Sequence, residues 1–119
     1  MKLTRFEDLE CWQQARNLTR MVYETTKNNG FKKNLRLSGQ IQAAATSSMA
    51  NIAEGFRKRG KADKVRFMNI AEGSIEESRY YLILAQDLGY GQTEKLMNSL
   101  EEVSRLLNGY AKAILTPDF

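Results

Sequence analysis

The chain has 119 residues, of which 42% are hydrophobic and 27% are charged, with a single proline and a formal net charge of +4. This composition predicts one compact domain over residues 1–119 and excludes disordered and collagen-like chains. No run approaches the roughly 20 apolar residues that a membrane span needs, and the stretch MKLTRFEDLECW lacks the apolar core of a secretory signal. We therefore expect a cytoplasmic protein with no membrane partner.

The chain contains one cysteine and no histidine. Cys11 has no second cysteine with which to form an internal disulfide, and a zinc site would need carboxylates and that one thiolate. The lack of histidine also removes the commonest general base and every Ser-His or Cys-His nucleophile pair. The sequence therefore predicts no enzyme, with no catalytic residues, no cofactor and no metal.

Apolar residues at helical spacing appear first between about residues 8 and 28. They alternate at intervals of four and three, as on one face of a helix, at Cys11, Ala15, Leu18 and Val22. The stretch KNNG follows, and residues 28–30 are types that adopt the left-handed conformation in which helices often end. The pattern predicts a helix over residues 8–28 that closes at this stretch.

A second helix is predicted over residues 34–57, and Gly60 interrupts the chain after it. Its inner face would consist of Leu37, Ile41, Ala45, Ser48, Ile52 and Phe56. A third helix is predicted over residues 61–88, with Gly89 as its C-terminal cap. Its inner face keeps the same alternation through Met68, Ala71, Ile75, Ser78, Leu82 and Ala85.

The fourth predicted helix spans residues 93–115, with Thr93 as its N-terminal cap, and Pro117 prevents its continuation. Its inner face would consist of Leu96, Leu100, Val103, Leu107, Tyr110 and Ile114. Four amphipathic helices joined by short loops, with no strand-like alternation between them, indicate an all-α protein. The expected fold is an antiparallel up-down four-helix bundle.

The third predicted helix carries more apolar surface than one bundle core needs. A second row lies beside its inner face and contains Phe67, Ile70, Ser74, Tyr81, Leu84 and Leu88. The second helix has an outer stripe of short side chains, which permit close helix approach. An exposed face of short side chains is the alternative, but we predict a homo-oligomer. Its interface would include Gln40, Ala43, Ser47, Asn51, Glu54, Phe67, Ile70 and Tyr81.

Positive charge is concentrated in the stretch RKRGKADKVR, where six basic residues and one acidic residue give +5, more than the net charge of the whole chain. The six residues are termed the basic loop: Arg57, Lys58, Arg59, Lys61, Lys64 and Arg66. Such a cluster is typical of surfaces that bind phosphates, and an oligomer would repeat it. We expect it to bind RNA or another nucleic acid. Only Phe56 and Phe67 flank it, which favours backbone or shape recognition over the reading of bases.

The five letters NIAEG occur twice, at residues 51–55 and 69–73. Their flanks, FRKRG and SIEES, do not match, which argues against a duplicated working part. We expect the copies to lie on different, antiparallel helices, the first of them on the assembly surface. Their carboxylates, Glu54 and Glu72, are the pair that a magnesium-dependent nuclease would need to converge.

Three stretches of the chain resemble a known family: FEDLECWQQARNLTRMVYETTK, LSGQIQAAATSSMANIAEGFRKR and RFMNIAEGSIEESRYYLILAQDLGY. Over nearly the whole chain they are similar to the four-helix bundle proteins encoded within intervening sequences of bacterial 23S ribosomal RNA genes. The resemblance is most specific at Leu37, Gln40, Ser48, residues 51–55, Gly73, Ser74 and Glu77.

This resemblance implies a small bacterial protein without established enzymatic activity. A related protein is the accessory variability protein of diversity-generating retroelements, a basic homopentameric barrel that associates with a reverse transcriptase and nucleic acid. By resemblance we expect a homopentamer. The positions that match the family motif would then have packing and hydrogen-bonding roles: Gln40, Ser48, Asn51, Glu54, Gly73 and Glu77.

The chain also departs from the family pattern. Gln42 and Ala43 stand where the family usually has arginines, and Lys64 stands where it usually has an aromatic residue. The missing arginines weaken any nucleic-acid inference drawn from the family alone. Three hypotheses therefore stay open. They are a nucleic-acid-binding oligomer, a protein-interaction scaffold or accessory subunit (for example of a reverse transcriptase) without direct nucleic-acid binding, and a metal-dependent nuclease.

Overall fold

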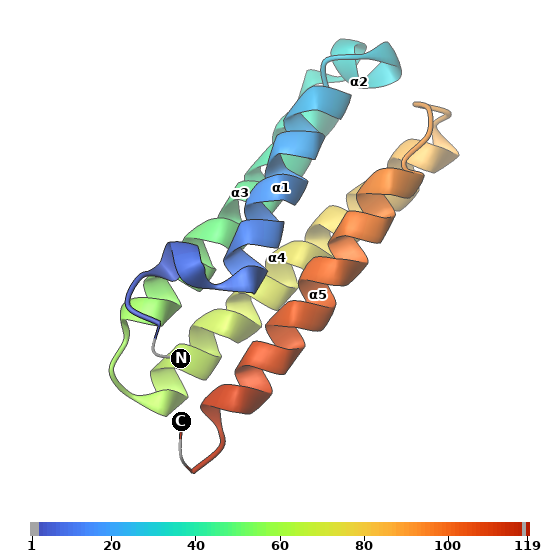
Figure 1. The fold of residues 1–119 in the computed structure, drawn as a ribbon. Coiled ribbons are helices and arrows are strands. Elements are labelled where there is room, and N and C mark those ends of the chain that lie inside the picture. Colours follow the sequence, from blue (N-terminus) through green and yellow to red (C-terminus); the bar gives the residue numbers. More distant parts are fainter. Residues whose placement is uncertain (1–2, 118) are drawn as a thin grey trace.

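A computed structural model describes residues 3–117 and 119. The chain forms four long helices, α1 (Glu10–Thr25), α3 (Leu35–Arg57), α4 (Lys61–Asp87) and α5 (Glu94–Ile114) (Figure 1). Two short elements accompany them, the 3-10 turn η1 (Phe6–Asp8) and the helix α2 (Asn29–Lys33). The described residues contain no strand, so the prediction of an all-α fold is confirmed.

The four long helices pack as a ring of neighbours. α3 contacts α1 and α4, and α5 contacts α4 and α1, whereas the two diagonal pairs share few contacts. The closest association is between α3 and α4. Successive long helices run in opposite directions (Figure 1). The bundle is elongated, with dimensions of 48 × 21 × 20 Å. No helix in the described part of the chain is long and apolar enough to cross a membrane.

The predicted inner faces form the core, because apolar residues at intervals of three and four share one side of a helix. Every residue of the four faces is buried except Phe56 and Tyr110, which are half-buried near helix ends. Buried residues recur along all four long helices, so the core runs the length of the bundle. Full burial of each leucine or isoleucine contributes roughly 1.5–3 kcal/mol to folding.

The loop between α4 and α5 confirms one predicted cap and corrects another. Gly89 has φ +73°, and the Gly89 and Tyr90 N–H groups donate to the carbonyls of Gln86 and Ala85, which is the Schellman arrangement. Thr93 does not cap α5 with its side chain. Its hydroxyl instead accepts a hydrogen bond from Gln86 Nε2 at 2.5 Å, so it holds the loop to α4.

The predicted end of the first helix is wrong. α1 ends at Thr25, and within the described residues only Gly89 and Gly91 are glycines with positive φ. Gly30 lies inside α2, where a Cβ would stand 2.1 Å from the Tyr90 ring. Glycine is required there because Tyr90 packs directly on α2, with its ring 5.4 Å from that of the buried Phe31.

Cys11 is buried in the core, and this burial raises the pKa of its thiol to about 11. Because the thiolate is the reactive form, we expect iodoacetamide at about pH 8 to alkylate the folded protein at least about a hundredfold more slowly than the urea-unfolded chain. Mass spectrometry of samples taken over time measures both rates. Equal rates would contradict the buried position of the thiol.

Candidate nucleic-acid interface

The basic loop connects the two most closely packed helices at one end of the bundle. α3 ends at Arg57 and α4 begins at Lys61, so only residues 58–60 lie outside a helix. The N-terminal segment and the last residues of the chain lie at this same end (Figure 1). The Lys61 Nζ group donates a hydrogen bond to the backbone carbonyl of Thr116, which joins the loop to the segment after α5.

Close approach of α3 and α4 fixes the base of the loop. Gly55 is buried, and a Cβ there would stand 2.5 Å from Met68 Cε and 2.6 Å from Phe67 Cβ. The absence of a side chain thus lets α4 pass directly over the last turns of α3. Residues 58–60 are enough to connect the two helices because the end of α3 and the start of α4 lie next to each other.

Two of the basic residues lie over one aromatic ring. Lys58 Nζ is 5.0 Å from the centre of the Phe67 ring, and Arg66 Cζ is 4.7 Å from it. Each such contact contributes about 0.5–1 kcal/mol at an exposed site. Arg66 also lies 3.5 Å from an Asp63 carboxylate oxygen. Phe67 therefore orders the cations around it.

Lys64 stabilises the end of α3. Its Nζ donates to the Phe56 carbonyl at 2.6 Å, one of the terminal carbonyls that lack a partner within the helix, and lies 5.3 Å from the Phe56 ring centre. The pKa of Lys64 is lowered because partial burial removes water from the ammonium group. Lys61 is likewise engaged, with the Thr116 carbonyl.

Arg57 and Arg59 are the most available cations of the basic loop. Both are exposed, and neither forms a salt bridge within residues 3–117 and 119. An exposed guanidinium without a carboxylate partner can bind a phosphate through two parallel N–H groups. The charge available for a polyanion therefore lies mainly on these two side chains, with Lys58 and Arg66 beside them.

The residues predicted to form an oligomer interface lie on one surface along α3 and α4. The Tyr81 hydroxyl is 3.3 Å from Gln40 Oε1, and the Ser74 hydroxyl donates to Ser47 Oγ at 3.0 Å, so the two predicted stripes meet. This surface is termed the α3–α4 face, and it comprises Gln40, Ala43, Ser47, Asn51, Glu54, Phe67, Ile70 and Tyr81. All eight are exposed or half-buried.

Large apolar side chains extend the α3–α4 face toward the far end of α4. Ile70 is 42% exposed, and Leu84 and Leu88 are 43% and 48% exposed. A hollow of about 320 Å³ lies beside Leu84, between the start of α3 and the end of α4. It is lined by Asn34, Arg36, Leu37, Gln40, Tyr81 and Leu84. The surface is thus both apolar and indented.

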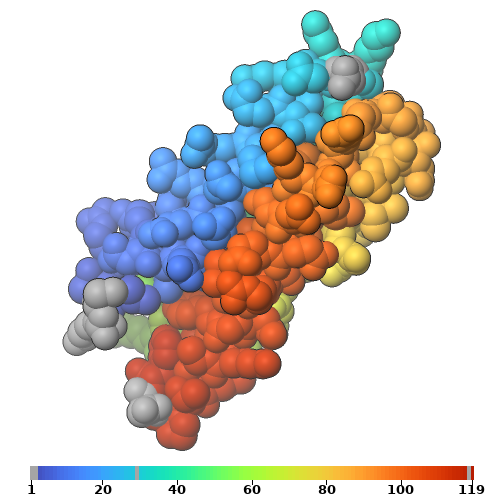
Figure 2. Space-filling view, turned by 45° about the vertical axis from the view of Figure 1, so that its right-hand side comes forward, coloured from blue at the N-terminus to red at the C-terminus, as the bar shows by residue number. Residues whose placement is uncertain are grey.

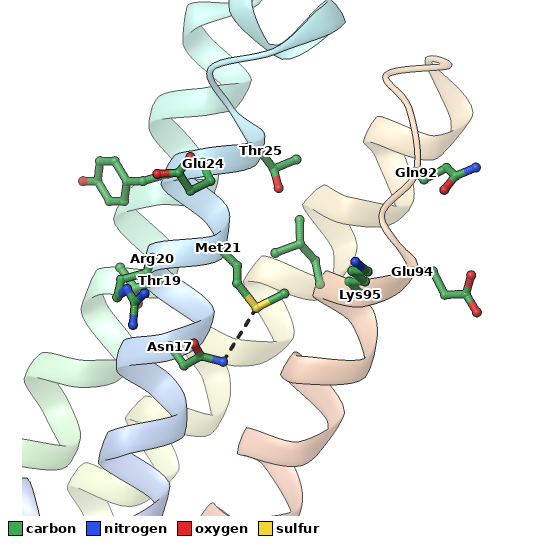
Figure 3. A pocket seen from close by; sticks show the side chains of 11 residues that line it. Asn17, Thr19, Arg20, Met21, Glu24, Thr25, Gln92, Glu94 and Lys95 are labelled. Atoms are coloured by element: carbon green, nitrogen blue, oxygen red, sulfur yellow. Dashed lines mark hydrogen bonds between the residues drawn. The ribbon is translucent and has the colours of Figure 1, made fainter.

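A different hollow, of about 660 Å³, opens between α1 and the start of α5. These two helices lie side by side on the face shown in Figure 2. Met21 points from α1 toward α5 across the hollow, whereas Gln92 and Glu94 point away from α1 at its outer rim (Figure 3). Its lining mixes Arg20 and Lys95 with acidic residues, and it lies near the opposite end of the bundle from the basic loop. It therefore does not extend the positive surface.

The end of the bundle that carries the basic loop is termed the basic end, and it also contains Arg5, which sequence reasoning missed. A hollow of about 270 Å³ separates the N-terminal segment from the end of α3, and its lining includes Arg5 and Arg57. The two residues are far apart in the sequence, and only the antiparallel packing of α1 on α3 places them together. No local sequence signal reveals this proximity.

Comparison with known proteins decides the family. Residues 7–109 match the family described as 23S rRNA-intervening sequence protein. The chain belongs to this family. A crystal structure of a protein with unknown function from the S23 ribosomal protein family of Bacteroides thetaiotaomicron shares the fold, with a TM-score of 0.77 and 24% identity over 86% of this chain and 95% of that chain. No curated protein matches the chain.

Several positions that carry the family resemblance make hydrogen bonds in this intervening-sequence protein. The buried Ser48 hydroxyl donates to the Ala45 carbonyl at 2.6 Å, and Asn51 Nδ2 donates to the Ser47 carbonyl at 2.8 Å. The Glu77 carboxylate lies 3.4 Å from the Tyr81 hydroxyl. These contacts fit structural roles on and beneath the α3–α4 face.

The two NIAEG copies of this family member occupy different environments. In the first copy Ile52 is fully buried and Glu54 is exposed. In the second copy Ile70 is 42% exposed on the α3–α4 face. The half-buried Glu72 has a raised pKa because burial disfavours its charge. The described residues contain no group of three or more metal-ligating side chains. The phrase thus serves two structural roles.

Proposed function

We propose that this protein is a non-enzymatic homo-oligomer that binds structured RNA through the basic end of its bundle. The observation that carries the proposal is the exposed pair Arg57 and Arg59, which have no carboxylate partner among the described residues. Lys58 and Arg66 lie beside them, ordered by the Phe67 ring. Phosphate groups are the ligands that such a cluster attracts most strongly.

A single copy presents few cations, so repetition by an oligomer matters to the proposal. Affinity for a polyanion rises steeply with the number of phosphates contacted, because each contact releases condensed counterions. Several copies related by symmetry would present several basic ends at fixed spacing on one assembly. The likeness to a family with a homopentameric relative supports a pentamer as the number of copies.

RNA binding by the wild-type protein is expected to fall steeply with salt. Fluorescence anisotropy of a labelled RNA hairpin, measured between about 50 and 200 mM salt, should show a loss of about 10³-fold if six or more phosphates are contacted by the assembly. Affinity that does not change with salt would contradict electrostatic binding. No retardation of RNA, together with a nuclease-insensitive protein pull-down, would favour the scaffold hypothesis instead.

The α3–α4 face is proposed as the assembly surface. Its apolar extension and the hollow beside Leu84 offer the combination of apolar area and shape that subunit contacts use. Short side chains such as Ala43 allow a helix of another copy to approach closely. An isolated bundle would leave this area in water at a cost of about 25 cal/mol per Å².

A long charged side chain in the middle of this face is expected to prevent assembly. Ala50→Arg, at an exposed position of α3 one helical turn from both Ser47 and Glu54, should shift the protein from oligomer to monomer in size-exclusion chromatography with light scattering. The reason is that a buried unpaired charge costs several kcal/mol per contact. Ala113→Arg, an equal change at an exposed position on α5, is the matched control and should leave the oligomer intact. A monomeric wild type would refute the assembly proposal.

A further inference from the structure

We propose that the hollow between the N-terminal segment and the end of α3 binds one unpaired base of an RNA. The inference rests on the proposed RNA-binding function and deepens it, since it gives the basic end a preference for a bulge or loop over a plain duplex. The hollow is lined by Thr4, Arg5, Phe6, Glu7, Phe56 and Arg57.

The size and position of this hollow suit a single flat group. It measures about 270 Å³, slightly less than the roughly 300–1,000 Å³ of pockets that take drug-sized ligands. It lies where η1 packs on α3, directly beside the exposed Arg57. A base that enters the hollow would therefore leave its own phosphate within the positive field of the basic end.

Two aromatic rings of the lining provide stacking surface. The Phe6 ring is held in a T-shaped contact with Trp12, with 5.0 Å between ring centres and 69° between ring planes. Phe56 belongs to the last turn of α3 and packs against the bundle core. Unstacked RNA bases bind by stacking on such fixed rings. From sequence alone only Phe56 and Phe67 flanked the cations, because the fold is needed to add Phe6.

A carboxylate in the same hollow is positioned to read base edges. Arg5 Nε and Nη2 donate to Glu7 Oε2 at 2.9 and 2.7 Å, which leaves Oε1 without a bond in this pair. Gln13 Nε2 donates to the Glu7 carbonyl at 2.8 Å and fixes the backbone of the turn. The hydrogen bond from Arg5 lowers the pKa of Glu7, so the carboxylate stays ionised.

An ionised carboxylate accepts hydrogen bonds and donates none, which selects among bases. Guanine presents two adjacent donors, N1–H and N2–H, that can both reach the free Oε1, whereas uracil presents one N–H flanked by two acceptor oxygens that the carboxylate repels. The hollow is thus expected to prefer an unpaired guanosine. Bases inside a duplex are stacked and paired, so they cannot enter it.

The test compares three labelled RNA hairpins of equal charge and stem sequence, measured by fluorescence anisotropy. One has a bulged guanosine, one has a bulged uridine, and one is fully paired with the extra nucleotide placed at its end. The wild-type protein should bind the bulged-guanosine hairpin at least about fivefold more tightly than the paired hairpin, as expected for one stacked base. The bulged-uridine hairpin should fall between the two.

Two variants separate stacking from edge recognition. Phe6→Leu keeps an apolar side chain against Trp12 but removes the ring, so it should reduce the preference for both bulges. Glu7→Gln keeps the shape but removes the charge, so it should remove the preference for guanosine over uridine. Glu24→Gln, at an exposed position near the end of α1, is the matched control and should change nothing.

Equal, salt-dependent binding of all three hairpins by the wild type would overturn the base site and leave the proposed function standing. If the wild-type protein bound none of the three hairpins, the proposed function itself would be refuted. A preference that survives both Phe6→Leu and Glu7→Gln, with thermal unfolding unchanged, would also overturn the assignment to this hollow.

Discussion

Reversing the charges of Arg57 and Arg59 together, as Arg57→Glu and Arg59→Glu, is expected to abolish RNA binding at physiological salt. Both side chains are exposed and lack a carboxylate partner within the described residues, so the wild-type pair is available for phosphates. The double variant replaces two attractive charges by two repulsive ones. We expect affinity to fall on the order of a hundredfold or more.

The salt dependence gives a second, independent signature of the same sites. If each arginine contacts one phosphate per subunit, the slope of log K against log salt should become less steep by about 1 for each contact removed. Fluorescence anisotropy over a salt series measures both the affinity and this slope. A loss of affinity with an unchanged slope would indicate that the arginines act through folding or assembly.

A matched control tests position against net charge. Lys32 and Lys33 are exposed on α2, at the opposite end of the bundle from the basic loop. Lys32→Glu with Lys33→Glu changes the net charge by the same amount, and it should lower affinity much less. Equal losses in the two double variants would show that binding depends on overall charge, and the basic end would lose its special role.

The long helices and their inner faces were predictable because the signal is periodic over twenty or so residues. A pattern such as Met68, Ala71, Ile75 and Ser78 repeats often enough to fix both the element and its buried side. The short elements α2 and η1 were missed because five or three residues are too few for a pattern of apolar residues to repeat. Their existence depends on tertiary contacts.

The misassigned caps have the same physical origin. Gly30 is a glycine because the ring of Tyr90 covers it, and Thr93 holds Gln86 rather than the start of α5. Both partners come from other elements, so local turn propensities could not reveal them. The basic loop was likewise evident from composition, but its tertiary contacts were not. Lys61 donates to the Thr116 carbonyl and Lys64 to the Phe56 carbonyl, and neither hydrogen bond could be read from the sequence.

Substituting alanine at the two glycines of the repeated NIAEG phrase is expected to change stability in opposite directions. Gly55→Ala places a Cβ 2.6 Å from Phe67 Cβ, an atom next to the backbone of α4, so the two helices must separate. Overpacking of this kind costs about 1–3 kcal/mol. Urea unfolding at fixed protein concentration measures the change.

Gly73→Ala should instead stabilise the protein. Gly73 lies inside α4, is exposed, and would place its Cβ at a position with no atom within 4 Å. Alanine there reduces the conformational freedom of the unfolded chain, which contributes about 0.5–1 kcal/mol. Gly109→Ala on α5 meets the same conditions away from the α3–α4 face, so it controls for any effect of the new methyl group on assembly.

The opposite signs expected for the stability changes of Gly55→Ala and Gly73→Ala distinguish the structural roles of the two NIAEG copies. Met68 Cε, the other atom near Gly55, is the end of a flexible side chain and can move, whereas Phe67 Cβ moves only with its helix. The cost of Gly55→Ala therefore measures how firmly α4 is held against α3 beside the basic loop. If Gly55→Ala were as stabilising as Gly109→Ala, this contact would not be what positions the arginines.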